Sequence, residues 1–151
     1  MNELREKIFA WILKRQPARK IVMPQWNEIR RVVVLYPNGN IQHIIKQIEN
    51  SAKEVVQFTL PDKKDINWLT KRPNSDVREQ IMARHFDLLI DLTQQPSLTM
   101  QYMAMYIRAD FKVGRFIREG IHDLTIDTPP QPAPDYLLEQ ILKYINMFGQ
   151  K

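Results

Sequence analysis

The chain has 151 residues, with 22 lysines and arginines against 17 acidic residues, ten prolines and no cysteine. This length suits one domain that can bury a core without covalent staples. The absence of cysteine excludes disulfides, thiolate metal sites and cysteine nucleophiles. The basic excess is confined to the start of the chain: residues 1–31 hold eight basic and three acidic residues, whereas residues 32–151 hold fourteen of each.

An amphipathic helix is expected over residues 2–16, because its apolar residues recur at helical spacing. These residues are Leu4, Ile8, Trp11 and Ile12. A proline-containing connector follows, so we expect a basic helix and connector over residues 1–30 and a single α/β domain over residues 31–151. No apolar stretch has the length of a signal peptide or a transmembrane helix. We therefore expect a cytoplasmic protein, with peripheral attachment to the inner membrane as a further expectation.

Strands and helices alternate from residue 31 onward. The continuous apolar run over residues 32–36 and the nearly all apolar run over residues 87–92 are typical of strands buried on both faces. A further strand is expected over residues 54–60, and shorter strands are expected over 111–116 and 123–127. This alternation predicts right-handed crossovers and a parallel sheet covered by helices. We expect a three-layer flavodoxin-like or half-Rossmann α/β sandwich of about five mostly parallel strands, ordered 2-1-3-4-5. The link to the last strand is too short for a full helix, which leaves an antiparallel or displaced fifth strand open.

Polar residues near the helix starts are expected to act as N-caps, because their side chains can accept hydrogen bonds from free backbone N–H groups. These residues are Asn2, Asp76 and Asp135.

Ligands of open α/β sheets bind outside the carboxyl ends of the strands, near the switch in strand order. The candidate ligand-binding residues at these ends are Asn38, Gly39, Asn40, Thr93, Gln94, Ser97 and Arg115. The turn over residues 38–40 could offer backbone N–H groups to an anion, but it lacks the glycine pattern of a dinucleotide or P-loop site. Helix capping is the ordinary alternative for such polar residues. Arg115 could clamp an anion or pair with Asp91 or Asp127.

Residues that could carry catalysis are few. The histidines His43, His85 and His122 are not at metal-ligand spacing, and we expect no metal and no cofactor. Hydrogen-bonded structural or surface roles are the expectation for these histidines, with His122 near the amino ends of the strands. Asp91 and Asp127 form a candidate carboxylate pair for acid–base chemistry. On balance the sequence favours a protein that is not an enzyme.

The stretch FDLLIDLTQQPSLTMQYMAMYIRADFKVGR, residues 86–115, resembles an uncharacterised family of small α/β proteins from Bacteroidota. That resemblance extends over nearly the whole chain, including Asn67-Trp68, and implies a basic N-terminal segment and an α/β domain but no activity. The same stretch more distantly resembles the N-terminal half of heptosyltransferase-type glycosyltransferases, through Asp87, Ile90, Asp91 and Gly114. That likeness implies an acceptor-side half-domain, because the chain is too short to contain the half that holds the nucleotide-sugar.

Two functions follow from these observations. The first is a non-catalytic binding module that uses its basic N-terminal segment for a protein partner or an anionic membrane surface. Its candidate residues are Lys7, Lys14, Arg15, Arg19 and Lys20. The alternative is a domain or enzyme that binds a sugar, nucleotide or phosphate at the strand carboxyl ends. Nucleic-acid binding is the weaker interpretation, since no recognition motif or interleaved aromatic platform accompanies the basic residues. The sequence does not predict an oligomeric state.

Overall fold

A computed structural model describes residues 3–22, 25–37, 40–51, 53–115, 117–129 and 132–149. Strands and α-helices alternate from the first strand to the fourth, as the sequence predicts, and the fifth strand follows the fourth with no helix between them. Two short 3₁₀ helices, η1 and η2, are also present. The elements in chain order are α1 (Glu3–Lys14), η1 (Trp26–Glu28), β1 (Arg31–Leu35), α2 (Gln42–Glu49), β2 (Glu54–Phe58), η2 (Lys63–Asp65), α3 (Ser75–Met82), β3 (His85–Asp91), α4 (Leu98–Tyr106), β4 (Arg108–Arg115), β5 (Leu124–Ile126) and α5 (Pro134–Gly149).

The strands form one parallel sheet in the order β2-β1-β3-β4-β5. In its centre, Val33 of β1 lies opposite Val56 of β2 and Leu89 of β3. The predicted strand order is confirmed. The antiparallel fifth strand that the sequence left open is wrong, because β5 runs parallel to β4 with Leu124 opposite Val113. β5 has three residues and pairs only with the end of β4. The short segment between the two strands is therefore long enough to bring the chain back for parallel pairing.

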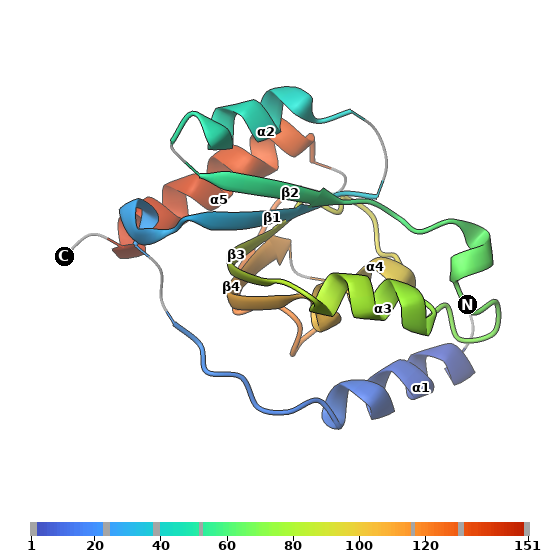
Figure 1. Cartoon of the computed structure of the whole chain (residues 1–151). Coiled ribbons are helices and arrows are strands. Elements are labelled where there is room, and N and C mark those ends of the chain that lie inside the picture. The colour runs from blue at the N-terminus through green and yellow to red at the C-terminus, as the bar shows by residue number, and fades with distance from the viewer. Residues whose placement is uncertain are drawn as a thin grey trace.

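Helices cover both faces of the sheet, as Figure 1 shows. Successive strand residues point to opposite faces, so Val32 and Val34 pack in the core beneath α2 and α5, while Val33 and Leu35 pack in the core that α1, α3 and α4 cover. Burial on both faces explains why these strands are continuously apolar. The result is the expected three-layer α/β sandwich.

Helix α1 is part of the second core. Phe9 is fully buried, with its ring centroid 4.6 Å from that of Tyr102 on α4, and Ile12 is 7% exposed. Leu4 and Trp11, which share the apolar spacing read from the sequence, are instead 53% and 58% exposed. The helix is therefore turned so that Phe9 faces the domain and Trp11 faces outward. Among the described residues, no helix is long and apolar enough to cross a membrane.

Two predicted helix caps are corrected by the structure. The N-cap of α3 is Asn74, whose Oδ1 accepts a hydrogen bond from the backbone N–H of Val77 at 3.0 Å, and Asp76 lies inside the helix. Asp135 lies in the first turn of α5, where its Oδ1 is 2.9 Å from Nε2 of His43. In both cases the helix begins at least one residue earlier than expected. The predicted cap Asn2 lies outside the described residues.

Candidate functional site

The carboxyl edge of the sheet brings two of the predicted ligand-binding residues together. Arg115, at the end of β4, donates from Nη1 to the carbonyl oxygen of Gln94 at 2.9 Å and from Nε to Oγ1 of Thr128 at 3.2 Å. Gln94 in turn donates from Nε2 to the carbonyl oxygen of Pro132 at 2.6 Å. These bonds tie the segments after β3, β4 and β5 to one another, so Arg115 holds this edge together and pairs with neither Asp91 nor Asp127 nor any other described carboxylate.

The other predicted residues of this edge are separated by their local roles. Ser97 accepts a hydrogen bond from the backbone N–H of Met100 at 3.3 Å and caps α4. Asn40 accepts one from the backbone N–H of Gln42 at 2.9 Å, at the start of α2. Thr93 is 3% exposed, and its Oγ1 has no hydrogen-bond partner among the described residues. Asn38 and Gly39 lie outside the described residues.

A buried carboxylate–imidazole pair lies at the end of β3. Oδ2 of Asp91 is 2.9 Å from Nε2 of His122, and the two side chains are 6% and 3% exposed. Oδ1 of Asp91 accepts the backbone N–H of Thr93 at 2.9 Å. His122 therefore lies over the carboxyl half of the sheet and not at the amino ends, because β5 begins opposite Val113, near the carboxyl end of β4. Each of the three histidines contacts an aspartate, and we expect such a carboxylate to fix the tautomer of its imidazole.

Gly114 makes room for this pair. A Cβ at position 114 would lie 2.9 Å from Nε2 of His122 and 3.0 Å from Cβ of Asp91. Both distances are shorter than van der Waals contact allows, so only glycine fits beneath the imidazole without a shift of its neighbours.

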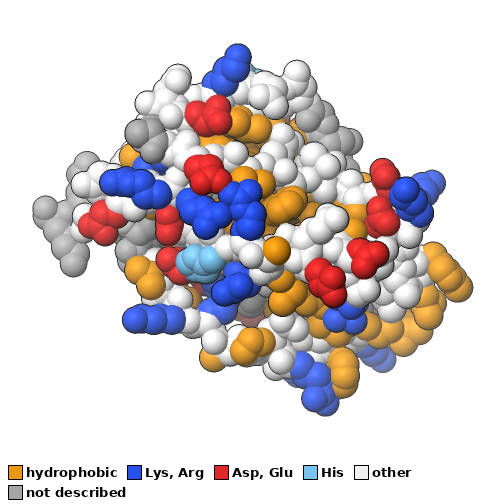
Figure 2. Space-filling model, viewed as in Figure 1, with side chains coloured by type: hydrophobic (Ala, Val, Ile, Leu, Met, Phe, Trp, Pro, Cys, Tyr) orange, Lys and Arg blue, Asp and Glu red, His pale blue; other side chains and the backbone are white. Residues whose placement is uncertain are grey.

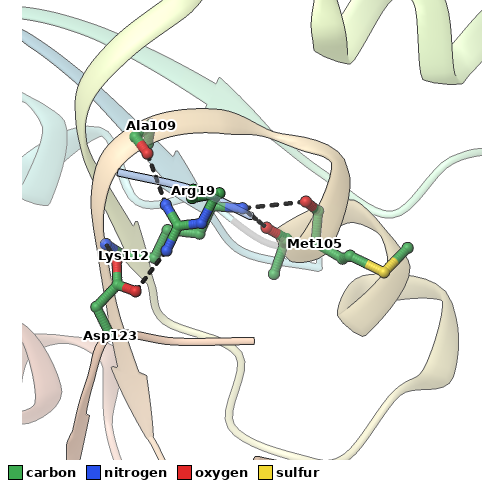
Figure 3. Close-up of polar contacts among 6 residues, drawn as sticks. Arg19, Met105, Ala109, Lys112 and Asp123 are labelled. Carbon is green, nitrogen blue, oxygen red and sulfur yellow. Dashed lines mark hydrogen bonds and ion pairs between the residues drawn. The ribbon is translucent and has the colours of Figure 1, made fainter. Parts of the chain in front are cut away.

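A buried lysine lies beside the connector that follows α1. Lys112 of β4 is 1% exposed, and its Nζ donates to the carbonyl oxygens of Ala104 and Met105 at 2.7 and 3.0 Å. Figure 3 shows the guanidinium of Arg19 next to it, bonded to the carbonyl of Ala109 and the carboxylate of Asp123. Burial, and then the charge of Arg19, lower the pKa of Lys112 to about 7, while Asp123 opposes the shift. Through its two hydrogen bonds, Lys112 provides donors for carbonyl groups that have no backbone partner at the end of α4.

The basic residues predicted for surface binding are placed in two ways. Lys7, Lys14 and Lys20 are exposed. Arg15 lies over the ring of Trp11, with Cζ 4.1 Å from the ring centroid. Arg19 is directed inward to Asp123 and fastens the connector to the domain. All five residues are therefore on the surface, although the side chain of Arg19 is only 30% exposed because it contacts Asp123.

Most of the exposed hydrophobic side chains come from two segments of the chain. Of the ten large hydrophobic side chains that are exposed among the described residues, seven lie in residues 4–22 or 60–69. Trp68 is 77% exposed, and Arg5 of α1 donates to the carbonyl oxygens of Trp68 and Leu69 at 3.0 and 2.8 Å, which ties the two segments together. Figure 2 shows hydrophobic and basic side chains interleaved along the lower rim of the molecule, where Figure 1 places α1 and the connector.

A family profile described as "Family of unknown function (DUF6913)" matches residues 25–148. The chain belongs to this family. No curated protein and no solved structure matches it. A source in Bacteroidota and a relation to heptosyltransferases stay predictions. In this DUF6913 protein, α1 and the connector precede the matched residues, although Phe9 and Ile12 complete a core that the matched residues form.

Sequence reasoning missed one group of residues in this DUF6913 protein. The segment over residues 62–75 reads as a polar loop, yet it presents Trp68 and several basic side chains beside α1. The signal available in the sequence was the tryptophan itself, in a loop rich in lysine and arginine. Among the described residues, no group of three histidine or acidic side chains could hold a metal ion.

Proposed function

We propose that this protein attaches to anionic membrane surfaces through the outer face of α1, the connector and the segment before α3. The observation that carries the proposal is the pair of outward-facing tryptophans, Trp11 and Trp68, on a surface that also presents exposed lysines. Tryptophan side chains favour the boundary between lipid headgroups and hydrocarbon. Lysines beside them gain attraction to anionic lipid.

The charge of the chain supports the same surface. Residues 1–31 carry the whole formal excess of +5, and the remainder of the chain is formally neutral. The opposite layer, α2 and α5, offers exposed lysines as well, at Lys46 and Lys143. The lysines on α1 lie beside the exposed Trp11, whereas Lys46 and Lys143 lie on the opposite layer. Electrostatic attraction and insertion of an apolar ring can therefore act together at the surface of α1.

Flotation with lipid vesicles tests the attachment. We expect the full chain to float with phosphatidylcholine vesicles that contain phosphatidylserine and to stay behind with phosphatidylcholine alone. The double variant Trp11→Ser/Trp68→Ser should lose flotation, and Lys7→Gln/Lys14→Gln should weaken it. The matched control Lys46→Gln/Lys143→Gln removes the same charge from the opposite layer and should float like the wild type. If the two double lysine variants lose flotation equally, or if the wild type does not float, the proposal is contradicted.

A second candidate is a small-molecule site at the strand carboxyl ends. It is supported by the meeting of Gln94, Arg115 and Thr128 at that edge, where the switch in strand order places ligands in other α/β sheets. It is also the place where an acceptor-side half-domain of a glycosyltransferase would bind a sugar. A thermal-shift screen of sugar phosphates, nucleotides and nucleotide-sugars, repeated with Arg115→Ala, tests it. A flat response in both proteins contradicts this candidate.

A further inference from the structure

A cavity of about 460 Å³ lies between α1 and the segment that contains η2 and the start of α3. Ile8, Trp11 and Ile12 form its wall on α1, and Lys64, Arg72 and Arg78 line the side that the segment contributes. No acidic side chain is among the described residues that line it. The cavity therefore has an apolar wall and an opposing wall with three positive charges.

Both arginines are held against the ring of Tyr106. Arg72 donates from Nε to the hydroxyl of Tyr106 at 2.8 Å, and its Cζ lies 5.6 Å from the centroid of that ring. Cζ of Arg78 lies 6.0 Å from the same centroid, and its Nη1 donates to the carbonyl oxygen of Pro73 at 2.6 Å. Neither arginine forms an ion pair with a described carboxylate. Fixed guanidinium groups lose little entropy when they bind an anion.

The segment that carries Arg72 is rigid and locally strained. Oδ1 of Asn67 accepts the backbone N–H groups of Leu69 and Thr70 at 2.9 and 3.0 Å. Lys71 has a φ of 66°, an uncommon conformation for a residue with a side chain. Its carbonyl oxygen accepts the hydroxyl of Thr99 at 2.7 Å, which fixes the turn to α4. Strain of this kind persists only where the surrounding structure holds it, and it is concentrated at binding sites.

We propose that this cavity binds the phosphate of a phosphomonoester. Two arginines and a lysine match the three oxygens of such a group, since guanidinium groups bind phosphate in a bidentate manner. The exposed Trp11 in the opposite wall and Trp68 nearby make a lipid headgroup the source of the phosphate, as in phosphatidic acid. This choice of source rests on the proposed attachment to membranes, whereas the phosphate site itself does not.

Calorimetric titration with glycerol phosphate tests the site apart from any membrane. We expect saturable binding by the full chain and, because one charge-assisted hydrogen bond is lost, at least about tenfold weaker binding by Lys64→Gln. Lys64 is exposed, so this change spares the fold. Lys63→Gln removes the adjacent exposed charge outside the cavity and should bind like the wild type. Arg78→Gln, checked for folding by circular dichroism, should repeat the loss.

Vesicles distinguish the sources of the phosphate. Phosphatidic acid should give stronger flotation than phosphatidylserine at equal total charge, and Lys64→Gln should remove that difference. Binding of glycerol phosphate without any flotation supports the phosphate site and contradicts membrane attachment. Flotation without preference for phosphatidic acid, together with no binding of glycerol phosphate, overturns the phosphate site and leaves the attachment standing. Equal weakening by Lys64→Gln and Lys63→Gln also overturns it.

Discussion

Gly114 is the residue whose replacement has the clearest structural cost. An alanine there places Cβ against Nε2 of His122 and Cβ of Asp91, so the buried Asp91–His122 pair or the strand must shift. We expect Gly114→Ala to lower the free energy of unfolding by about 1–3 kcal/mol, the usual range for overpacking. Denaturant titration measures this. In a His122→Ala background the same change should cost less, and an unchanged cost in that background would show that the imidazole does not set the limit.

Lys112 gives the protein a pH dependence of a definite sign. Its pKa of about 7 in the folded state is below the 10.5 of an exposed lysine, so between these values the unfolded state binds more protons. Stability therefore rises as pH increases from about 7 toward 10.5, at no more than about 1.4 kcal/mol per pH unit. Lys112→Met should flatten this rise in melting curves taken across the window.

The exposed Lys46→Met is the matched control and should keep the slope of the wild type. If Lys112→Met and the wild type gain stability with pH in parallel, Lys112 does not titrate in this window. The two carbonyls at the end of α4 lose their donor in the variant, so its stability at any single pH is not informative. Only the difference in slope tests the pKa.

Helix α1 is at once part of the core and part of the proposed membrane surface, and two substitutions separate these roles. Phe9→Ala removes a fully buried ring and should cost about 3–5 kcal/mol of unfolding free energy. Trp11→Ala removes a mostly exposed ring and should change stability little while it weakens flotation with anionic vesicles. Thermal unfolding and flotation measured on both variants check this. If Trp11→Ala lost more stability than Phe9→Ala, this would contradict the orientation in which Phe9 faces the core and Trp11 faces outward.

The hydrophobic pattern of the sequence was sufficient to predict the strands of the sheet, but it was insufficient to predict which face of α1 is buried. Strands β1 and β3 are buried on both faces, so their continuous apolar runs identify them without knowledge of the fold. In α1, apolar residues occur on two overlapping stripes, and contact with Tyr102 of α4 selects the stripe that contains Phe9. That contact is tertiary, so local spacing could not predict it. The cap of α3 was misplaced because Asn74 and Asp76 are both suitable N-cap residues.

At the scale of the whole molecule, attachment to an anionic surface should depend on salt. The Debye length falls from about 10 Å at 0.1 M to about 3 Å at 1 M ionic strength. We expect the vesicle-bound fraction to fall across this range and to keep a residual part that Trp11→Ser/Trp68→Ser abolishes. Sedimentation of vesicles at graded salt concentrations measures both parts. A bound fraction that is constant over this range would contradict a role for the lysines.

The sequence predicted the positions of two residues at the carboxyl edge of the sheet. Strand ends can be read from the sequence, so Gln94 and Arg115 were correctly placed at one edge of the sheet. The basic cavity was not predictable, since Trp11 and Arg72 meet only when α1 packs beside the loop before α3. The buried pair of Asp91 and His122 was missed for the same reason: the register of β5 on β4 decides where His122 lies.

The anchoring of the connector has a consequence for biosynthesis. Arg19 and its partner Asp123 are 104 residues apart in the chain. A ribosome adds about 5–20 residues per second, so the connector leaves the ribosome roughly 5–20 s before its partner Asp123 does. Phe9 of α1 precedes its ring partner Tyr102 of α4 by a comparable interval. We therefore expect the nascent protein to present an uncovered amphipathic helix to chaperones and membranes before the domain closes over it.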